Sequence, residues 1–345
     1  MRRALAALAV VLALCAALAA FLAWREVVDF RSTRYGGPEE KVVVIPSGAT
    51  ARAVVRALAQ AGALSRERTA WFYVRFVRRD PRPFRAGEYS FTGPLPPDAV
   101  LDRVHLGQVK LYRLTVAEGL RADEIAELVG RTSLVRAEDF LAVARDPSVA
   151  EALGLPYRSL EGFLFPDTYI LARGISARAV ADLMVARFKE AYARAEAARK
   201  PEVKLDMGQV ATLASIVEKE TGQESERPRI ACVFENRLRL GMRLQTDPTV
   251  MYATLLRTGH WSKNITKADL LTAHPYNTYT FSGLPPGPIA NAGAAALRAV
   301  LAPDACADLY FVSRNDGTHQ FCPDLTCHNA AVRTWQVDFF HRSER

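Results

Sequence analysis

The stretch Val210–Tyr252, VATLASIVEKETGQESERPRIACVFENRLRLGMRLQTDPTVMY, holds the pattern that decides the fold of this chain. Apolar residues recur across 210–217 at positions i, i+3, i+4 and i+7, which predicts a helix with one face in a core. Two acidic residues, Glu218 and Glu220, follow on opposite edges of that face. The stretch therefore predicts a carboxylate pair at the end of a core helix.

The two carboxylates have different neighbours along the predicted helix. The positions three, four and seven residues before Glu218 hold only serine and alanine, whereas those before Glu220 hold valine, isoleucine and leucine. A carboxylate above small side chains has room for a bulky substrate, and partial burial raises its pKa, as a general acid requires. The pattern favours Glu218 as a catalytic acid; the alternative is a glutamate at a helix edge that meets water.

The N-terminus has the composition of a membrane segment. Ala4–Trp24 is a run of 21 uncharged residues, long enough to span a bilayer, and Arg2 and Arg3 before it indicate a cytoplasmic start. A signal peptide cleaved after Ala19 is an alternative, although its apolar region is usually only ~7–15 residues long. A lipoprotein signal at Cys15 would require a small residue where Leu14 stands. A single-pass anchor is therefore predicted.

The net charge of +8 comes from 45 Lys and Arg residues scattered along the chain. A nucleic-acid-binding protein would concentrate them on one face or in a known module, so no nucleic acid partner is expected. A basic surface outside the membrane would favour anionic lipids or an anionic wall polymer.

The five cysteines do not form a disulfide framework in a chain of this length. Cys15 lies in the membrane run, Cys232 in a helical apolar pattern and Cys306 after a loop. Cys322 and Cys327 have four residues between them and are flanked by histidines, which leaves three alternatives: a disulfide, two free thiols or a zinc site.

A strand, a glycine turn and an amphipathic helix are predicted twice, in Lys41–Leu64 and again from Leu114, with Gly48 matching Gly119. From about residue 135 the pattern is mostly helical, and a late hairpin is predicted around residues 315–317. The chain is therefore predicted to be α+β. The other expected helices are 67–77, 98–106, 177–199, 208–221, 225–241, 247–257 and 325–340, and the other expected strands are 85–91, 309–312 and 319–321.

Five ordered motifs resemble those of the YceG-like family of endolytic murein transglycosylases. They are LEGFLFPDTY (160–169), ASIVEKET (214–221), FENRLRLGMRLQTDPTVMYA (234–253), YNTYTFSGLPPGPIANAG (276–293) and THQF with CHN (318–321 and 327–329). The chain departs from the family at Ala292, where proline is more usual. The resemblance covers about residues 41–335.

The resemblance implies a domain order and a reaction. The expected parts are a cytoplasmic start and transmembrane helix (1–26), a tether (27–40), a small LysM-like α+β module (41–110) and a mainly helical catalytic domain with a few short strands (111–345). The expected reaction cleaves nascent peptidoglycan between N-acetylmuramic acid and N-acetylglucosamine, leaves 1,6-anhydro-muramic ends and helps to terminate glycan elongation. The catalytic domain would lie on the extracytoplasmic side, and neither cofactor nor metal is implied.

The resemblance also implies the site. Glu218 matches the family's catalytic glutamate, acting first as acid and then as base. Glu161 and Asp167 match the family too, with a structural role favoured, and capping is the alternative for Asp247. The expected substrate-binding residues are Gln245, Asp247, Tyr276, Asn277, Tyr279, Asn291, His319, His328 and Asn329. Tyr279 also fits a core position, and a hydrogen-bonding structural role is an alternative for the late histidines.

Three further readings concern partners and activity. Glycan strands and the cytoplasmic membrane are the expected partners, with peptidoglycan synthases added by family analogy. A non-catalytic wall-binding scaffold is the alternative from another class of function. A hydrolase that releases reducing ends is a third possibility; it differs from the transglycosylase only because water, and not a hydroxyl group of the sugar, attacks.

Overall fold

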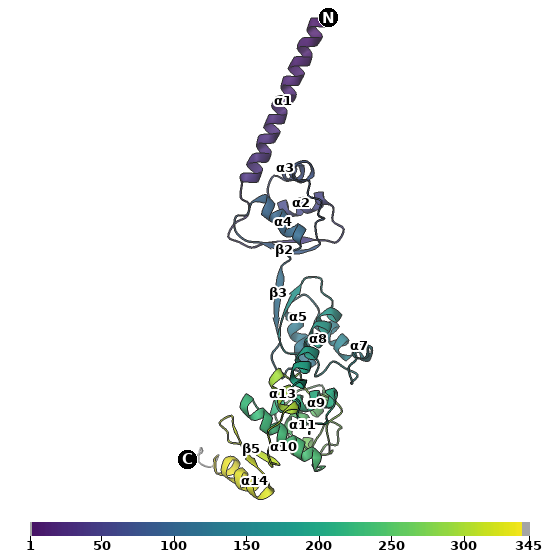
Figure 1. The fold of residues 1–345 in the computed structure, drawn as a ribbon, viewed down its shortest axis with the longest axis vertical. Coiled ribbons are helices and arrows are strands. Elements are labelled where there is room, and N and C mark those ends of the chain that lie inside the picture. Colours follow the sequence, from purple (N-terminus) through teal and green to yellow (C-terminus); the bar gives the residue numbers. More distant parts are fainter. Residues whose placement is uncertain (1, 340–345) are drawn as a thin grey trace. The chain divides into compact units, whose positions relative to one another are not determined.

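The computed structural model describes residues 2–339, and the chain divides into two units (Figure 1). Unit 1 consists of Met1–Tyr112 with Ile170–Gly174, and unit 2 consists of Arg113–Tyr169 with Ile175–Arg345. The helices and strands that lie wholly in the first of these ranges are α1 (Arg2–Ser32), β1 (Lys41–Ile45), α2 (Ala51–Gln60), α3 (Glu67–Phe72), the π-helical η1 (Tyr73–Arg78), β2 (Gly87–Phe91) and α4 (Pro97–Leu106).

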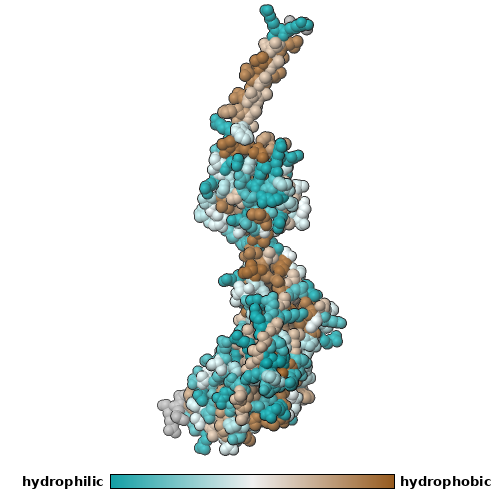
Figure 2. Space-filling model, viewed as in Figure 1, coloured by the Kyte–Doolittle hydropathy of each residue, from teal (hydrophilic) through white to brown (hydrophobic). Residues whose placement is uncertain are grey.

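Helix α1 ends inside the core of unit 1. Val27 and Phe30 are buried, and the ring centroid of Phe30 lies 5.5 Å from that of Tyr35 and 5.7 Å from that of Tyr73. Residues 27–32, the first part of the predicted tether (27–40), therefore continue α1, because their apolar positions repeat at helical spacing. Residues 2–26 are exposed, and α1 is long and apolar enough to cross a membrane (Figure 2).

The core of unit 1 lies between an antiparallel strand pair and its helices. β1 pairs with β2, with Val43 opposite Tyr89, and α2 buries Val54, Val55 and Leu58. Thr50 caps the first turn of α2, because its side chain accepts a hydrogen bond from the Ala53 N–H.

Unit 2 is mostly helical. β3 (Leu111–Thr115) and β4 (Thr168–Ala172) form a two-stranded sheet, and the boundary between the units falls within both strands. The other elements are α5 (Ala122–Arg131), α6 (Ala137–Arg145), α7 (Pro147–Ala152), α8 (Ala177–Glu196), α9 (Met207–Glu220), η2 (Glu224–Glu226), α10 (Arg227–Arg239), α11 (Asp247–Thr258), α12 (Lys267–Leu271), α13 (Ala294–Leu301), β5 (Tyr310–Ser313), β6 (His319–Cys322), α14 (Leu325–Val332) and η3 (Arg333–Asp338).

Helix α9 is the centre of unit 2. Every residue from Val210 to Val217 is buried, because α10, α11 and α13 all pack against this helix. The prediction of one buried face was therefore too narrow. The small residues are part of the packing, and the Ile289 N–H donates a hydrogen bond to the Ser215 hydroxyl over 3.0 Å.

The predicted α+β class is confirmed, and the LysM-like character of the first module stays a prediction. Both predicted glycine turns are present: Gly48 has φ +76° and Gly119 has φ +75°, a left-handed conformation that favours glycine, and each precedes a helix. The late hairpin is confirmed as β5 and β6, with Phe311 opposite Phe321.

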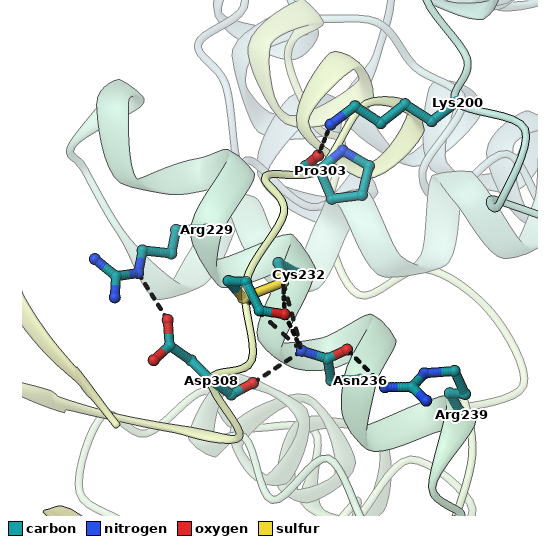
Figure 3. Close-up of a disulfide and its surroundings, with 8 residues drawn as sticks. Lys200, Arg229, Cys232, Asn236, Arg239, Pro303 and Asp308 are labelled. Carbon is teal, nitrogen blue, oxygen red and sulfur yellow. Dashed lines mark hydrogen bonds and ion pairs between the residues drawn. A yellow bond between two sulfur atoms is a disulfide. The ribbon is translucent and has the colours of Figure 1, made fainter. Parts of the chain in front are cut away.

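Two disulfides fasten the C-terminal part of unit 2. Cys322–Cys327 joins β6 to α14, which selects the disulfide among the three alternatives. Cys232–Cys306 joins α10 to the segment before β5 and was missed, because its cysteines are 74 residues apart. Next to it, the Asn236 side chain donates hydrogen bonds of 3.1 Å to the carbonyl oxygens of Cys306 and Asp308 (Figure 3). These contacts fix the segment that leads into β5.

Candidate active site

A cavity of about 450 Å³ in unit 2 brings together the end of α9, the start of α11, β5 and α14. The residues around it are mostly polar or aromatic. Its lining consists of Glu220, Arg237, Gln245, Asp247, Tyr279, Tyr310, Phe311, Leu325 and His328.

Glu220 is one of the two acidic residues that line this cavity. It is the last residue of α9, and its carboxylate accepts a hydrogen bond from the Thr246 hydroxyl. Burial, with a smaller contribution from Asp247, raises the pKa of Glu220 to about 7, although Thr246 and Arg237 act in the opposite direction. Near neutral pH this carboxyl group can therefore both give and take a proton.

Thr246 is held in place by a cluster of buried hydroxyl groups. Its backbone N–H donates to the Thr278 hydroxyl over 3.1 Å, and the hydroxyl oxygens of Thr249 and Thr278 are 2.8 Å apart. Because these groups satisfy one another without water, the Thr246 hydroxyl keeps a fixed direction toward Glu220.

Arg237 supplies the positive charge. Its side chain donates hydrogen bonds to the carbonyl oxygens of Leu309 (2.6 Å) and Leu244 (2.5 Å), and its guanidinium lies 5.2 Å from the ring centroid of Tyr310. No ion pair within residues 2–339 includes Arg237, so its charge is open to the cavity.

Asp247 and Tyr279 form a second polar pair at the cavity. The Tyr279 hydroxyl donates to the Asp247 carboxylate over 2.6 Å, and burial together with this bond raises the pKa of Tyr279. Thr246, rather than Asp247, is the N-cap residue of α11, so the capping alternative for Asp247 is wrong. Gln245 has φ +48°, a conformation that costs a non-glycine residue roughly 1–3 kcal/mol and is concentrated at functional sites.

His328 closes the other side of the cavity. Its ring centroid lies 4.9 Å from that of Tyr310, and within the described part of the chain its buried Nδ1 has no hydrogen-bond partner. Burial, reinforced by Arg237, lowers the pKa of His328, so the ring is neutral at pH 7. A neutral ring with a free nitrogen suits a hydrogen bond to a bound hydroxyl.

Glu218 does not line this cavity. Its side chain is 4% exposed, one carboxylate oxygen lies 2.6 Å from the Arg227 guanidinium, and the other accepts the Gly293 N–H over 3.0 Å. Burial raises the pKa of Glu218, as predicted, and Glu118 adds to the shift, while Gly293 and Arg227 oppose it. The space predicted above the small residues of the helix is filled by packing. The assignment of Glu218 as catalytic acid stays a prediction, and the geometry favours Glu220.

Gly293 leaves room for a second carboxylate beside Glu218. A Cβ atom at position 293 would lie 1.8 Å from one carboxylate oxygen of the half-exposed Glu118 side chain, which would have to move. The other carboxylate oxygen of Glu118 lies 3.5 Å from the Arg227 guanidinium. Two carboxylates therefore share one guanidinium here, an arrangement that fixes α9 to α10 and to the loop before α13.

Other predicted site residues lie elsewhere in unit 2. Tyr276 lines a second cavity of about 570 Å³, together with Glu161, whose pKa burial raises to about 7. Asn277 and Asn291 are each 1% exposed and bind backbone groups. The Asn277 side chain donates to the carbonyls of residues 269, 270 and 272. The Asn291 side chain donates to the carbonyl of residue 120 and accepts from the N–H of residue 164. These two amides order loops.

The late motif is divided. His319 contacts Glu226 over 2.7 Å and not the cavity, Asn329 is exposed on α14, and His328 is the member that lines the cavity. Glu220, Arg237 and Tyr310 also line the cavity but were not among the predicted site residues. Arg237 lies within the FENRLRLG motif, whose spacing alone did not separate it from the other arginines. Asp167 pairs with Arg187 over 2.6 Å, in keeping with the structural role favoured for it.

Comparison with known proteins adds an independent result. The sequence matches the YceG-like family over residues 43–334. It is 30% identical over 304 residues to the endolytic murein transglycosylase of Bacillus subtilis, covering 83% of this chain and 82% of that protein. It is 29% identical over 318 residues to the protein of the same name from Streptococcus pneumoniae D39, covering 55% of that protein. The crystal structure of a yceG-like protein from Listeria monocytogenes, 30% identical, superposes with a TM-score of 0.57 over 85% of this chain and 99% of that chain.

Proposed function

Because the chain belongs to the YceG-like family, we propose that it is an endolytic peptidoglycan lytic transglycosylase that cuts between N-acetylmuramic acid and N-acetylglucosamine. Its relatives are named endolytic murein transglycosylases, which supports a lyase acting on peptidoglycan. The observation that carries the proposal is the Glu220 carboxyl group, which has a pKa of about 7 and lines a polar, aromatic cavity. Glu220 is the residue to which we assign the acid–base role.

One carboxyl group serves both steps of the proposed reaction. Protonated Glu220 donates its proton to the glycosidic oxygen as the bond from C1 of the muramic acid breaks. The C6 hydroxyl oxygen of the same sugar then bonds to C1, and its proton passes to the Glu220 carboxylate. The two transfers restore the starting protonation state, consume no water and leave a 1,6-anhydro end.

The other cavity residues hold the sugars in this proposal. Gln245 and the free Nδ1 of His328 offer hydrogen bonds, and the Tyr310 ring offers an apolar face. Arg237 stabilises the ionised form of Glu220 that follows the first proton transfer. Glu218 acts as a positioning residue, because its pairing with Arg227 fixes the end of the helix that carries Glu220.

A hydrolase is the second candidate, and Asp247 is the observation that favours it. A hydrolase needs a second carboxylate to activate water or form a covalent intermediate, and Asp247 lines the same cavity as Glu220. The Tyr279 hydroxyl already occupies one oxygen of Asp247, which favours a binding role. A raised pKa does not by itself exclude a non-catalytic scaffold, because burial also raises the pKa of Glu161 to about 7; the presence or absence of cleavage decides between them.

The proposed location is the extracytoplasmic side of the cytoplasmic membrane, with α1 as a single-pass anchor. The two disulfides of unit 2 support an oxidising compartment, since such bonds are rare in the cytosol. Action on nascent strands, a part in ending glycan elongation and contact with synthases are further parts of the proposal, drawn from family analogy.

Digestion of isolated glycan strands with the purified chain tests the reaction. The expected fragments end in 1,6-anhydro-muramic acid, one water lighter than reducing ends, and mass spectrometry separates the two. Fragments with reducing ends would make the protein a hydrolase. An absence of fragments from a folded chain would support the scaffold alternative.

A further inference from the structure

We infer that unit 1 carries a membrane-docking surface on α3 and η1. This surface contacts anionic lipid headgroups of the same bilayer that α1 is proposed to span. The surface is an outer stripe of five residues that alternate between cationic and aromatic. They are Arg68 and Phe72 on α3, Arg75 and Phe76 on η1, and Arg79 directly after η1. The inference rests on the anchor in the proposed function and not on the catalytic chemistry.

The stripe follows the spacing of one helical face. Its members recur at i, i+4, i+7, i+8 and i+11, and all five are exposed, Phe72 at 44% and Phe76 at 50%. The two rings lie 5.1 Å apart between centroids, and the Arg75 guanidinium lies 5.4 Å from the Phe76 ring centroid. Exposed aromatic rings interleaved with arginine are typical of helices at a membrane interface.

The charge of the stripe is uncompensated. The segment from Arg68 to Arg79 contains no acidic residue, and within residues 2–339 no ion pair includes Arg68, Arg75 or Arg79. Arg78, the remaining arginine of the segment, faces the other way into unit 1. Three free cations on one face attract a surface of negative charge such as an anionic leaflet.

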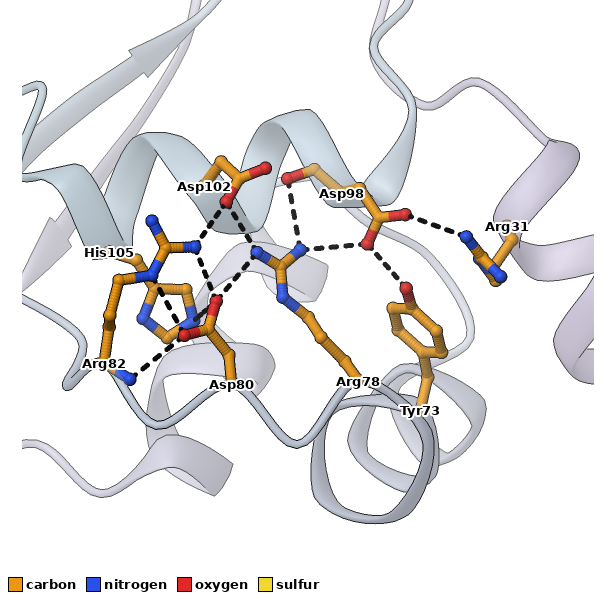
Figure 4. Close-up of polar contacts among 8 residues, drawn as sticks. All are labelled: Arg31, Tyr73, Arg78, Asp80, Arg82, Asp98, Asp102 and His105. Atoms are coloured by element: carbon orange, nitrogen blue, oxygen red, sulfur yellow. Dashed lines mark hydrogen bonds and ion pairs between the residues drawn. The ribbon is translucent and has the colours of Figure 1, made fainter.

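The inward side of the same segment is fixed. Arg78 pairs with Asp98 at 2.9 Å and Asp102 at 2.6 Å on α4, and the Tyr73 hydroxyl donates to Asp98 over 2.6 Å (Figure 4). Arg31, on α1, reaches the same Asp98 at 3.6 Å. These contacts hold α3 and η1 so that the stripe keeps its outward direction.

The position of α3 along α1 sets the stripe near the headgroups. Arg66, just before α3, pairs with Asp29 of α1 at 2.6 Å, and Tyr73 packs against Phe30. Those α1 residues lie about 7–9 Å beyond Trp24, the end of the uncharged run, at 1.5 Å per residue. The headgroup layer is about 5–8 Å thick on each side, so long side chains of α3 and η1 are within reach of it. Figure 1 draws α3 beside the end of α1, and Figure 2 shows apolar surface at this end of unit 1.

A depth measurement on the full chain tests the inference. The chain with Cys15→Ser is placed in nanodiscs, and a nitroxide is attached at Phe76→Cys or, as the matched control, at Leu111→Cys, which is 59% exposed in unit 1 outside the stripe. Oxygen is concentrated in lipid and a water-soluble nickel complex in water, so collisions with each report the surroundings of the label. In discs with anionic lipid, the label at 76 is expected to collide more often with oxygen, and the label at 111 more often with the nickel complex. Peptidoglycan cleavage plays no part in this readout.

The charge variant Arg68→Gln/Arg75→Gln provides the second arm. At about 1 kcal/mol per arginine near an anionic surface, loss of both arginines should lower the ratio of docked to undocked molecules about thirty-fold. Discs of neutral lipid should lower the same ratio to a similar extent when the arginines are present. Three results would overturn the inference: equal water exposure at both labels, lipid contact that survives loss of both the arginines and the anionic lipid, or contact that appears only when two chains share a disc. A chain that does not enter discs at all would remove the anchor and the inference together.

Discussion

Replacing Glu220 with glutamine separates the proton-transfer role of this residue from its place in the fold. Glutamine keeps an oxygen that accepts the Thr246 hydroxyl, but it has no proton to transfer. General acid–base catalysis contributes about 10²–10⁴-fold per step, and one residue serves both steps of the proposed reaction. The rate of strand cleavage should therefore fall by about 10⁴-fold or more.

The same variant should be more stable than the wild type above neutral pH. The folded-state pKa of Glu220 is about 7 against an ordinary 4.5, so folding binds a proton between these values and stability is lost as pH rises through this window. Above pH 7 the ionised carboxylate costs about 3 kcal/mol, at 1.36 kcal/mol per pKa unit. Thermal unfolding at pH 8 should show a higher midpoint for Glu220→Gln, with little difference at pH 4.

Glu218→Gln is the matched control on the same helix. It leaves the buried Arg227 guanidinium with Glu118 alone, at 3.5 Å, and should lower the unfolding free energy by about 3–5 kcal/mol. Its cleavage rate should fall far less than that of Glu220→Gln. The assays are fragment release from isolated glycan strands and thermal unfolding of both variants. An inactive Glu218→Gln of normal stability beside an active Glu220→Gln would refute the reasoning and return the acid role to Glu218.

Three further outcomes are expected. The kcat/KM for strand cleavage should fall about tenfold per pH unit above pH 7, because the Glu220 acid ionises there. Asp247→Asn should move this break in the profile to lower pH, because Asp247 helps to raise the pKa of Glu220. A profile that stays flat to pH 9 would argue against Glu220 as the acid. Cys322→Ala/Cys327→Ala should cost about 2 kcal/mol of stability and raise KM, because α14 carries cavity-lining residues; unchanged KM and denaturant midpoint would contradict this. Products of the wild-type chain should remain 1,6-anhydro ends when the digestion is run in ¹⁸O-labelled water, with no label in the new ends, whereas labelled ends would indicate hydrolysis.

The local elements could be read from the sequence because their signals are local. Helical periodicity identified α8 to α11 within a few residues, and the Asn-Asp-Gly turn identified the β5–β6 hairpin. The N-terminal helix was equally clear from its composition, yet its last turn was assigned to a tether. Val27 and Phe30 are too few to signal burial until the rings of Tyr35 and Tyr73 are known to surround Phe30.

The site was harder to predict because its parts come from distant segments. The residues one turn before Glu218 and Glu220 did not distinguish their environments. What distinguishes them is the covering segment: Arg227 and Gly293 close over Glu218, whereas Thr246 and Tyr310 leave a cavity at Glu220. No periodicity within α9 contains that information, and the order of the motifs along the chain does not contain it either.

The disulfide between Cys232 and Cys306 bears on how the protein is made. It closes a loop across 74 positions, which in the chain-entropy account contributes about 4 kcal/mol, a large share of a typical domain's stability. Before this bond forms, no covalent link ties the segment that leads into β5, with its Tyr310, to α10. If the chain is exported as proposed, this disulfide would require a thiol oxidant outside the membrane, and the cavity that Tyr310 lines would be completed only there. A cell deprived of that oxidant should accumulate this protein in a reduced, protease-sensitive form.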